Sequence, residues 1–210
     1  VHRRHDCSGA SVCRRWWKKN DPKEPADHAL GRSRGGFTTK IHILCDGDGH
    51  PLHFHLTPGQ AHDSTALDTV LEGADAQLLD SEGNRVAWPA QLGGDKGYRA
   101  DWIDEYVLAL GIKPVIPSKD NERSEHEPLV DAHRARMATE EAKKLYKRRK
   151  QTVELGFADV KQHRALRRFP RRGLQRASTP LGLAVLIHTL LEFLKVLTAM
   201  TPETSLTSAV

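Results

Sequence analysis

Residues 142–168, AKKLYKRRKQTVELGFADVKQHRALRR, predict one long helix around which the rest of the chain is organised. Apolar side chains recur there at roughly helical spacing, which indicates one buried stripe. Its members are Ala142, Leu145, Val153, Phe157 and Val160. At ~100° per residue, Lys147, Lys150 and Lys161 share a face with Glu154. Two interpretations are open: a solvated helix with ordinary ion pairs, or a metal-binding carboxylate on a surface that grips phosphates.

Positive charge is concentrated in this part of the chain. The 210 residues suffice for one domain with a small appendage, and 38% hydrophobic with 28% charged residues is typical of a globular protein. Net charge is +5 and the pI about 9.2. Residues 143–172 contain twelve Lys or Arg and only two acids, Glu154 and Asp159. Such a block suits nucleic acid; a solvated charge run is the plain alternative.

The cysteines and the apolar segments place the chain in a reducing, aqueous compartment. Cys7, Cys13 and Cys45 are odd in number and form no C-x-x-C, so neither a disulfide framework nor a zinc ribbon is predicted. No N-terminal signal peptide is visible. The apolar segment Leu181–Leu197 carries charged residues, which predicts a buried helix rather than a membrane span. We therefore expect a cytoplasmic protein.

Two stretches, Phe37–Cys45 and Pro51–Thr57, alternate with the strand period and flank DGDG at 46–49, a strong hairpin turn. They predict two antiparallel strands. Polar residues of the first strand share the face opposite Ile41; they are Thr38, Lys40 and His42. His53 and His55 share the outward face of the second strand. An H-x-H pair can bind metal, or it can simply form the polar side of a strand.

The flanking segments follow simpler rules. Residues 1–35 are polar and predicted irregular, and RRWWKK at 14–19 either stacks bases or anchors a loop. Asp63 or Ser64 is predicted to cap a helix. Its apolar residues are Leu67, Val70, Leu71 and Ala74. Residues 75–90 are expected to be a loop.

The second half of the chain is expected to alternate strands and helices. A short strand ends at Asp95, and the helix after it is stopped by Gly111. Ile112–Ile116 is a short strand with Pro114 on an edge. Residues 118–140 are densely charged and expected to be partly mobile. RRFPRRG at 167–173 breaks the long helix, and a final apolar helix runs to about residue 198, followed by a frayed tail.

Four stretches together resemble one family, the bacterial insertion-sequence transposases with a DDE catalytic domain. GRSRGGFTTKIHILCDGDGHPLHFHLTPGQAHDSTAL (31–67) resembles the family's strand pair, and GDKGYRA (94–100) the motif of its second aspartate. GIKPVIPSK (111–119) resembles the strand and turn that follow, and VELGFADVKQHRALRRF (153–169) the helix of the final glutamate. The resemblance covers roughly residues 27–175.

The resemblance implies a ribonuclease-H-like fold, a five-stranded mixed sheet with helices on both sides. It implies DNA cutting and joining with two Mg²⁺ (or Mn²⁺) ions, held in part by Asp95 and Glu154. Hard cations prefer carboxylate oxygens, and two ions ~3.5–4 Å apart would activate a nucleophile and stabilise the leaving oxygen. Asp95 and Glu154 are therefore expected to approach each other. Implied partners are double-stranded DNA, at the element's ends and the target, and further copies of the chain when active, without a membrane; the location implied is the nucleoid.

The helix departs from the family's pattern by one residue. Family members carry Tyr, then Arg after two residues, then Glu after three, then Lys after six. Here Tyr146 and Arg149 keep their mutual spacing, but four residues separate Arg149 from Glu154, so Arg149 would point ~140° away from it. Either Lys150 takes the place of the arginine, or a π-bulge absorbs the insertion. DNA-contacting residues by this resemblance are Tyr146, Lys147, Arg149, Lys150, Lys161 and Arg164.

The first catalytic aspartate is not assigned. In the family it lies on a strand before the GRSRGG region, and the opening VHRRHDCSGA resembles the segment just after that strand. Asp6, Asp21 and Asp27 are the aspartates upstream of the strand pair, and none lies in an apolar alternating run. We expect the C-terminal part of a transposase, from a split reading frame or a decayed element, and catalytically inert as residues 1–210 alone.

The expected organisation has three parts: an irregular basic segment at 1–35, the catalytic core at 36–175, and an apolar helix with its tail at 176–210. Three functions compete. The first is a DDE transposase domain, and the second a DNA-binding remnant without catalysis. The third, a zinc hydrolase built on the twelve histidines, lacks any ordered ligand spacing such as H-E-x-x-H.

Overall fold

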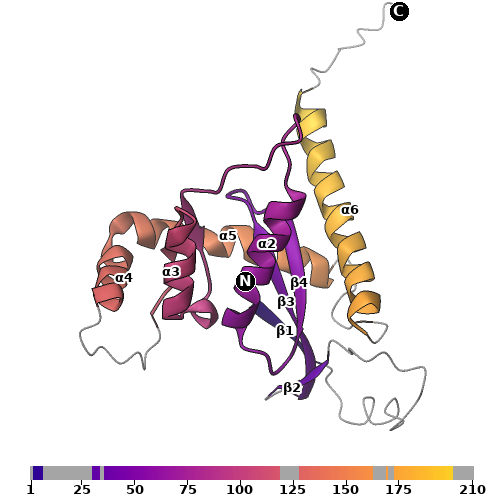
Figure 1. Cartoon of the computed structure of the whole chain (residues 1–210). Coiled ribbons are helices and arrows are strands. Elements are labelled where there is room, and N and C mark those ends of the chain that lie inside the picture. Colours follow the sequence, from indigo (N-terminus) through magenta and orange to yellow (C-terminus); the bar gives the residue numbers. More distant parts are fainter. Residues whose placement is uncertain are drawn as a thin grey trace, which may run out of the picture.

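The computed structural model describes residues 2–6, 30–33, 36–118, 128–162, 169 and 173–200, and has a mixed α/β architecture (Figure 1). Its strands are β1 (His2–Asp6), β2 (Gly31–Ser33), β3 (Gly36–Cys45), β4 (Pro51–Pro58), β5 (Gln91–Gly93) and β6 (Lys113–Val115). Its helices are α2 (Leu67–Gln77), α3 (Asp101–Ala109), α4 (Pro128–Ala138), α5 (Glu140–Gln162) and α6 (Leu174–Met200), with 3-10 turns η1 (Asp63–Ala66) and η2 (Lys96–Tyr98). The α/β class agrees with the sequence, but these strands form two sheets instead of one five-stranded sheet.

Strand β3 is the hub of the larger sheet. It pairs antiparallel with β1, β2 and β4, and the β3–β4 hairpin is the strand pair that the alternation predicted. One face packs on the first half of α6, where Ile41, Leu56 and Leu181 share a core cluster. The other face, expected to be outward, is covered as well, because Lys40 and His42 are buried. The polar side chains on one face of a central strand can be buried, provided that each finds a hydrogen-bond partner. Alternation of polar and apolar residues therefore does not require that one face be exposed.

The N-terminal segment is not irregular throughout. His2–Asp6 forms β1, which pairs with Thr38–His42 of β3, and Gly31–Ser33 forms β2. The prediction that residues 1–35 are irregular was therefore wrong for these two segments. HRRHD has little strand propensity, but β3 offers unpaired backbone groups with which it can pair whatever its side chains. RRWWKK at 14–19 lies outside the described residues.

The smaller sheet pairs β5 with β6 in parallel, and α3 is the crossover between them. Leu92, Ile103, Val107 and Ile112 are buried in a second core cluster, which α2 also joins. Gly111 follows α3 with φ +77°, the left-handed conformation that commonly ends a helix. The predicted strand, helix and strand after residue 90 are therefore confirmed.

Two details around α2 differ from expectation. Its buried residues are the four predicted, but neither predicted cap operates: a 3-10 turn precedes the helix, and its N-cap residue is Ala66. The side chain of Asp63 turns instead to Lys40. The helix also runs on to Gln77, so the loop predicted from residue 75 begins later.

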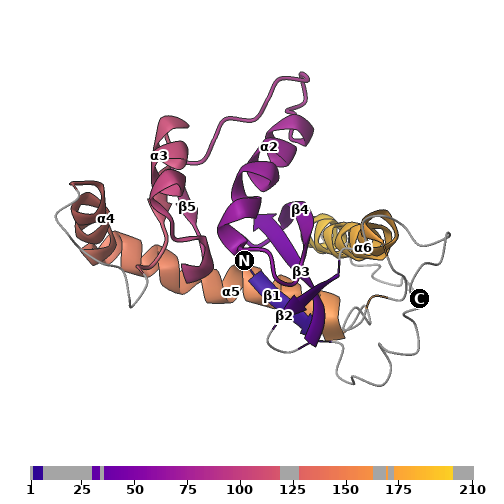
Figure 2. The ribbon, with the colours of Figure 1, turned by 60° about the horizontal axis from the view of Figure 1, so that its bottom comes forward.

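Helix α5 is the predicted long helix, described over Glu140–Gln162, and it contacts both sheets (Figure 2). Ala142 is buried near the end that follows α4, and Val153 packs against the first core cluster. Part of the segment predicted to be mobile is helical, because Pro128–Ala138 forms α4. α4 is held by its packing on α3 and α5.

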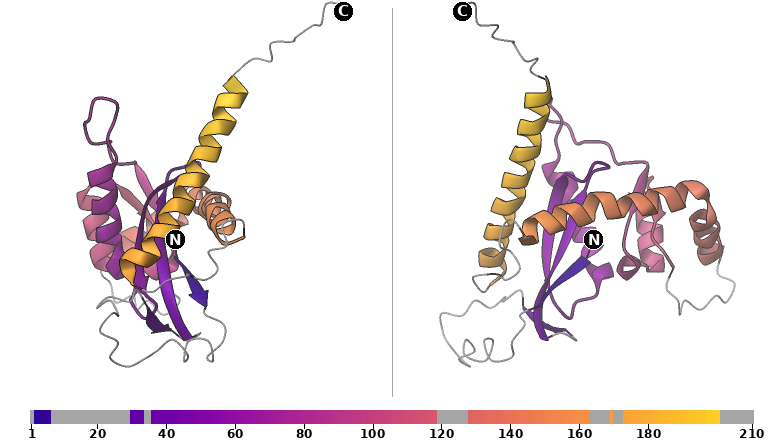
Figure 3. Two further views of the ribbon diagram at one scale, coloured as in Figure 1. Left: turned by 90° about the vertical axis from the view of Figure 1, so that its right-hand side faces the viewer. Right: turned by 180° about the vertical axis from the view of Figure 1, so that it is seen from behind.

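Helix α6 contradicts the prediction of a buried helix. Its first half packs on the large sheet, whereas its second half projects away from the body (Figure 3). By length and composition this helix could cross a membrane, and only 6% of its most apolar window is buried. Hydropathy predicted the helix correctly, but burial depends on what lies opposite it in space.

Candidate active site

Asp95 lies just after β5, at the start of the η2 turn. Its Oδ1 accepts a hydrogen bond from the Lys96 backbone N–H at 2.6 Å, which makes Asp95 the N-cap of η2. One carboxylate oxygen is thereby fixed by the backbone, and the other faces α5. The strand that ends before Asp95 and the turn that follows it fix this carboxyl group more firmly than a free loop would.

The structure brings Asp95 and Glu154 together at one arginine, although 59 positions separate them in the sequence. Arg149 Nη1 lies 4.0 Å from Asp95 Oδ2, and Nη2 lies 3.8 Å from Glu154 Oε1. Both distances exceed hydrogen-bond length, so these are loose ion pairs. Each carboxylate side chain is 33% exposed and therefore accessible to a ligand.

Arg149 reaches Glu154 despite the extra residue between them. The described α5 is assigned as α-helix throughout, so no π-bulge re-aligns the two positions. The long side chain instead swings around the helix, with its guanidinium carbon 5.2 Å from the centre of the Tyr146 ring. The expectation that Arg149 points away from Glu154 was therefore wrong, because side-chain length compensated for backbone angle.

The remaining predicted DNA contacts are only partly described. Lys147 is exposed on α5, and Tyr146 is half-buried beneath Arg149. Lys150 and Lys161 lie on α5, but their side chains fall outside the description, as does Arg164 altogether. The functions of these residues stay predictions.

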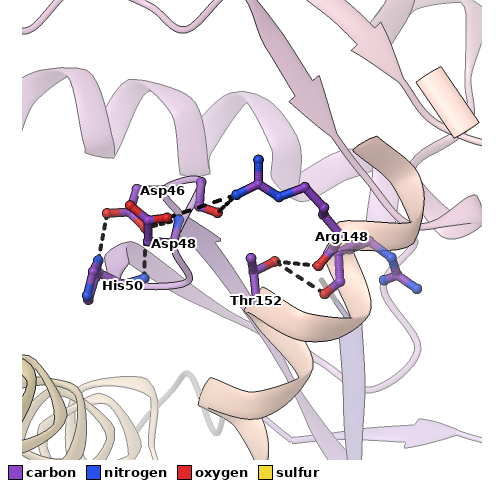
Figure 4. A network of polar contacts seen from close by, with 7 residues as sticks. Asp46, Asp48, His50, Arg148 and Thr152 are labelled. Atoms are coloured by element: carbon purple, nitrogen blue, oxygen red, sulfur yellow. Dashed lines mark hydrogen bonds and ion pairs between the residues drawn. The ribbon is translucent and has the colours of Figure 1, made fainter. Parts of the chain in front are cut away.

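The DGDG turn packs against α5 one turn before Glu154 (Figure 4). Arg148 Nη2 donates a hydrogen bond to the Gly47 carbonyl at 3.3 Å and lies 4.0 Å from Asp48. Gly49 has φ +98°, and a Cβ there would lie 3.1 Å from the backbone of Thr152. Glycine is therefore required at position 49 both by conformation and by close contact with α5.

A buried polar network lies beneath the Asp95 turn. Tyr98 of η2 shares a hydrogen bond with His42 Nδ1, and His42 Nε2 lies 2.8 Å from Thr57 Oγ1. This network links the turn to the centre of the large sheet. Burial raises the pKa of Tyr98, and the nearby carboxylates of Asp63 and Asp95 raise it further, so the hydroxyl stays protonated.

A buried ion pair supports the same turn. Lys40 Nζ lies 2.7 Å from Asp63 Oδ1 and also donates to the Ala61 carbonyl. A side chain at Gly97 would collide with the Asp63 carboxylate, so η2 rests directly on this pair. The sequence alone predicted no role for His42, Tyr98 or Lys40 in a site, and for Asp63 it predicted only a helix cap. The available signal was a run of polar residues on one face of the central strand.

The described residues contain no group of three or more His, Cys, Asp or Glu side chains that could hold a metal ion. His53 and His55 do not belong to such a group: His53 hydrogen-bonds Gln77 of α2, and His55, whose pKa is lowered by burial, has no third ligating side chain beside it among these residues. Cys45 is also unsuited to chemistry, because burial raises its pKa to about 11. Asp95 and Glu154 supply carboxylate oxygens, which are hard donors of the kind that bind Mg²⁺.

Comparison with known proteins identifies the family. The family described as Transposase DDE domain matches residues 13–190. A putative transposase for insertion sequence element IS402 from Burkholderia cepacia is 30% identical over 113 residues, 54% of this chain. The match covers 49% of that protein, so the chain spans about half the length of this relative. No solved structure matches. Because the family match extends over most of its length, the chain belongs to the transposase DDE domain family.

Proposed function

We propose that this protein is a DNA transposase of an insertion sequence, which cuts and joins DNA strands by metal-dependent phosphoryl transfer. The observation that carries the proposal is the convergence of Asp95 and Glu154 on Arg149, although 59 positions separate the two carboxylates in the sequence. Structural ion pairs are normally shorter and more buried, as between Lys40 and Asp63. Two accessible carboxylates that share one cation instead suit a divalent ion, which prefers carboxylate oxygens.

In this proposal each residue has a distinct task. Asp95 and Glu154 would hold a divalent cation, which supplies charge stabilisation for phosphoryl transfer. Arg149 offsets one of the two negative charges before DNA binds, which lowers the repulsion that a polyanion would meet. The proposed fold is ribonuclease-H-like, supported by the antiparallel β3–β4 hairpin and the parallel β5–β6 pair.

DNA is the proposed substrate, and α5 the proposed contact surface. Described and exposed cations on this helix include Lys143, Lys144, Lys147 and Arg148. Phosphate contacts release counterions, so each contact adds about one unit to the slope of log affinity against log salt concentration. We expect replacement of Lys147, Lys150 and Lys161 by Gln to flatten this slope alike for unrelated DNA sequences.

The control for that experiment neutralises Lys113, Lys195 and Arg85, three exposed cations on other elements. If binding depends only on net charge, both triple variants will lose the same slope, which contradicts a DNA surface on α5. Fluorescence anisotropy with duplexes of unrelated sequence, over a range of KCl concentrations, measures both slopes.

A non-catalytic DNA-binding remnant is the second candidate, favoured by the absence of a third clustered carboxylate among the described residues. Cleavage of DNA that flanks the coding region, assayed with Mg²⁺ or Mn²⁺, separates the two. Cleavage that Asp95→Ala and Glu154→Ala each abolish supports the transposase. Salt-sensitive binding without cleavage, unchanged in both variants, supports the remnant.

A further inference from the structure

The two faces of α6 change differently as the helix leaves the body. The face toward the body carries Ala177, Leu181 and Ala184, all buried. Continuing along the same side, at steps of three or four residues, the next positions are His188, Glu192 and Lys195. This face therefore becomes polar where the helix extends beyond the sheet (Figure 3). Lys195 and Glu192 form an ion pair at 2.7 Å there.

The opposite face stays apolar to the end of the helix. Six large side chains on it, here called the α6 seam, are all exposed. They are Leu183 (57%), Leu186 (53%), Leu190 (51%), Phe193 (58%), Leu197 (42%) and Met200 (73%). Their spacing alternates between three and four residues, which is the a and d pattern of a heptad repeat. At ~100° per residue, the seam lies roughly 170° from the buried face.

Exposed apolar patches of this size mark an interaction surface, and the heptad spacing indicates that the partner is another helix. We propose that the α6 seam is a dimerisation surface that binds the same seam of a second copy of this chain. A heptad seam is self-complementary, so two copies related by a two-fold axis bury the same residues.

The available area is sufficient for a stable dimer. The seam and its exposed neighbours Leu194 and Val196 present apolar surface on the order of 800 Å² per chain, about what each partner buries in a standard interface. The seam is also long enough, because Leu183 to Met200 span roughly 26 Å of helix axis. This surface does not involve Asp95 or Glu154, so the inference is independent of the proposed chemistry.

The polar stripe argues against a lipid bilayer as the partner. A helix that spans a bilayer alone is apolar on all sides, whereas His188, Glu192 and Lys195 form a polar stripe roughly 60° wide along the second half of α6. On this side, buried Ala184 is followed by the half-buried polar residues His188 and Glu192. A polar stripe opposite an apolar seam is expected for a helix that faces water on one side and another helix on the other. It is not expected for a helix surrounded by hydrocarbon.

The test compares the full chain with a variant carrying Leu190→Glu and Leu197→Glu. Lys195→Glu is the matched control, because it makes the same net charge change on the opposite side of the helix. Sedimentation velocity over a concentration series measures the dimer dissociation constant, and circular dichroism verifies folding. The full chain and the control should be dimers, and the double variant should dimerise at least ~100-fold more weakly.

Three results would overturn the proposal. The full chain could sediment as a monomer at all concentrations, or the double variant could remain a dimer, which would place the interface elsewhere. Alternatively, the chain could co-sediment with phosphatidylcholine–phosphatidylglycerol vesicles and the double variant not, which would assign the seam to lipid. Should the double variant lose helix content, the milder Leu190→Gln with Leu197→Gln is measured in its place, with the same criteria.

Discussion

Two sets of charged side chains meet around the turn that follows β5, and they are held in opposite ways. Lys40 and Asp63 lie 2.7 Å apart, with side chains only 8% and 11% exposed. Arg149 lies 3.8–4.0 Å from Asp95 and Glu154, whose side chains are each 33% exposed. The buried pair is short and closed, whereas the two outer carboxylates lie farther from their shared arginine and are partly open to water, although Arg149 itself is only 13% exposed.

The difference indicates which charges are structural. A buried charge is tolerated only when a partner compensates the lost hydration, so Lys40 and Asp63 depend on each other for the fold. Asp95 and Glu154 keep part of their hydration, so we expect a divalent cation to compete with Arg149 for them. Predictions for the two sets therefore differ: variants of the buried set should affect stability, and variants of the outer set should affect binding.

The largest effect is expected for Lys40→Met. The change keeps side-chain length but leaves Asp63 buried without its cation, which should lower the free energy of unfolding by about 3–5 kcal/mol. Urea unfolding followed by circular dichroism measures this. Lys143→Met, which removes an exposed ion pair with Glu140, should leave the urea midpoint nearly unchanged. Equal losses in both variants would contradict the assignment.

The next effect is expected for Tyr98→Phe. The ring stays packed, but His42 loses the hydroxyl that bonds its Nδ1, and the free energy of unfolding should fall by about 1–3 kcal/mol. Tyr106→Phe is the control, because this ring packs against the same core cluster at its edge. If both variants unfold at the same urea concentration, the hydrogen bond between Tyr98 and His42 does not stabilise the fold.

A smaller effect, on binding instead of stability, is expected for Arg149→Gln. Removing the cation between Asp95 and Glu154 relieves its competition with a divalent ion, so Mn²⁺ should bind roughly tenfold more tightly. Isothermal titration calorimetry of the whole chain measures the affinity. Arg148→Gln is the control, with the same charge change but a side chain turned to the hairpin. If Mn²⁺ affinity rose equally in both variants, the change in net charge alone would explain it, and Arg149 would not compete for the site.

The sequence predicted what local pattern and motif encode. Alternation predicted the β3–β4 hairpin, and resemblance to transposases selected Asp95 and Glu154, which the structure brings together. The burial of Lys40 and His42 was not predictable, because their partners Asp63 and Tyr98 lie 23 and 56 positions away. Likewise, hydropathy predicts a helix at α6, but only the three-dimensional arrangement reveals that the large apolar side chains of its second half are exposed.

The smallest effect concerns pH and the hairpin turn beside α5. Asp46 Oδ1 accepts hydrogen bonds from the backbone N–H groups of Asp48 and His50, and Oδ2 lies 2.9 Å from His50 Nδ1. Burial raises the pKa of Asp46, but these hydrogen bonds outweigh burial and lower it below its ordinary value. A lowered pKa adds stability above the unfolded value of about 3.9, which is lost as the pH falls through the folded value.

Stability of the wild-type chain should therefore fall more steeply than that of Asp46→Asn between about pH 5 and pH 3. Asparagine keeps an oxygen for the two backbone N–H groups, so the turn itself survives and only its charge is removed. Water screens a carboxyl this exposed, which keeps the difference small. Urea midpoints across this pH range measure it, with Asp48→Asn as the control of equal charge. Parallel curves for wild type and Asp46→Asn would show that the turn's hydrogen bonds stabilise the neutral acid as well as the carboxylate.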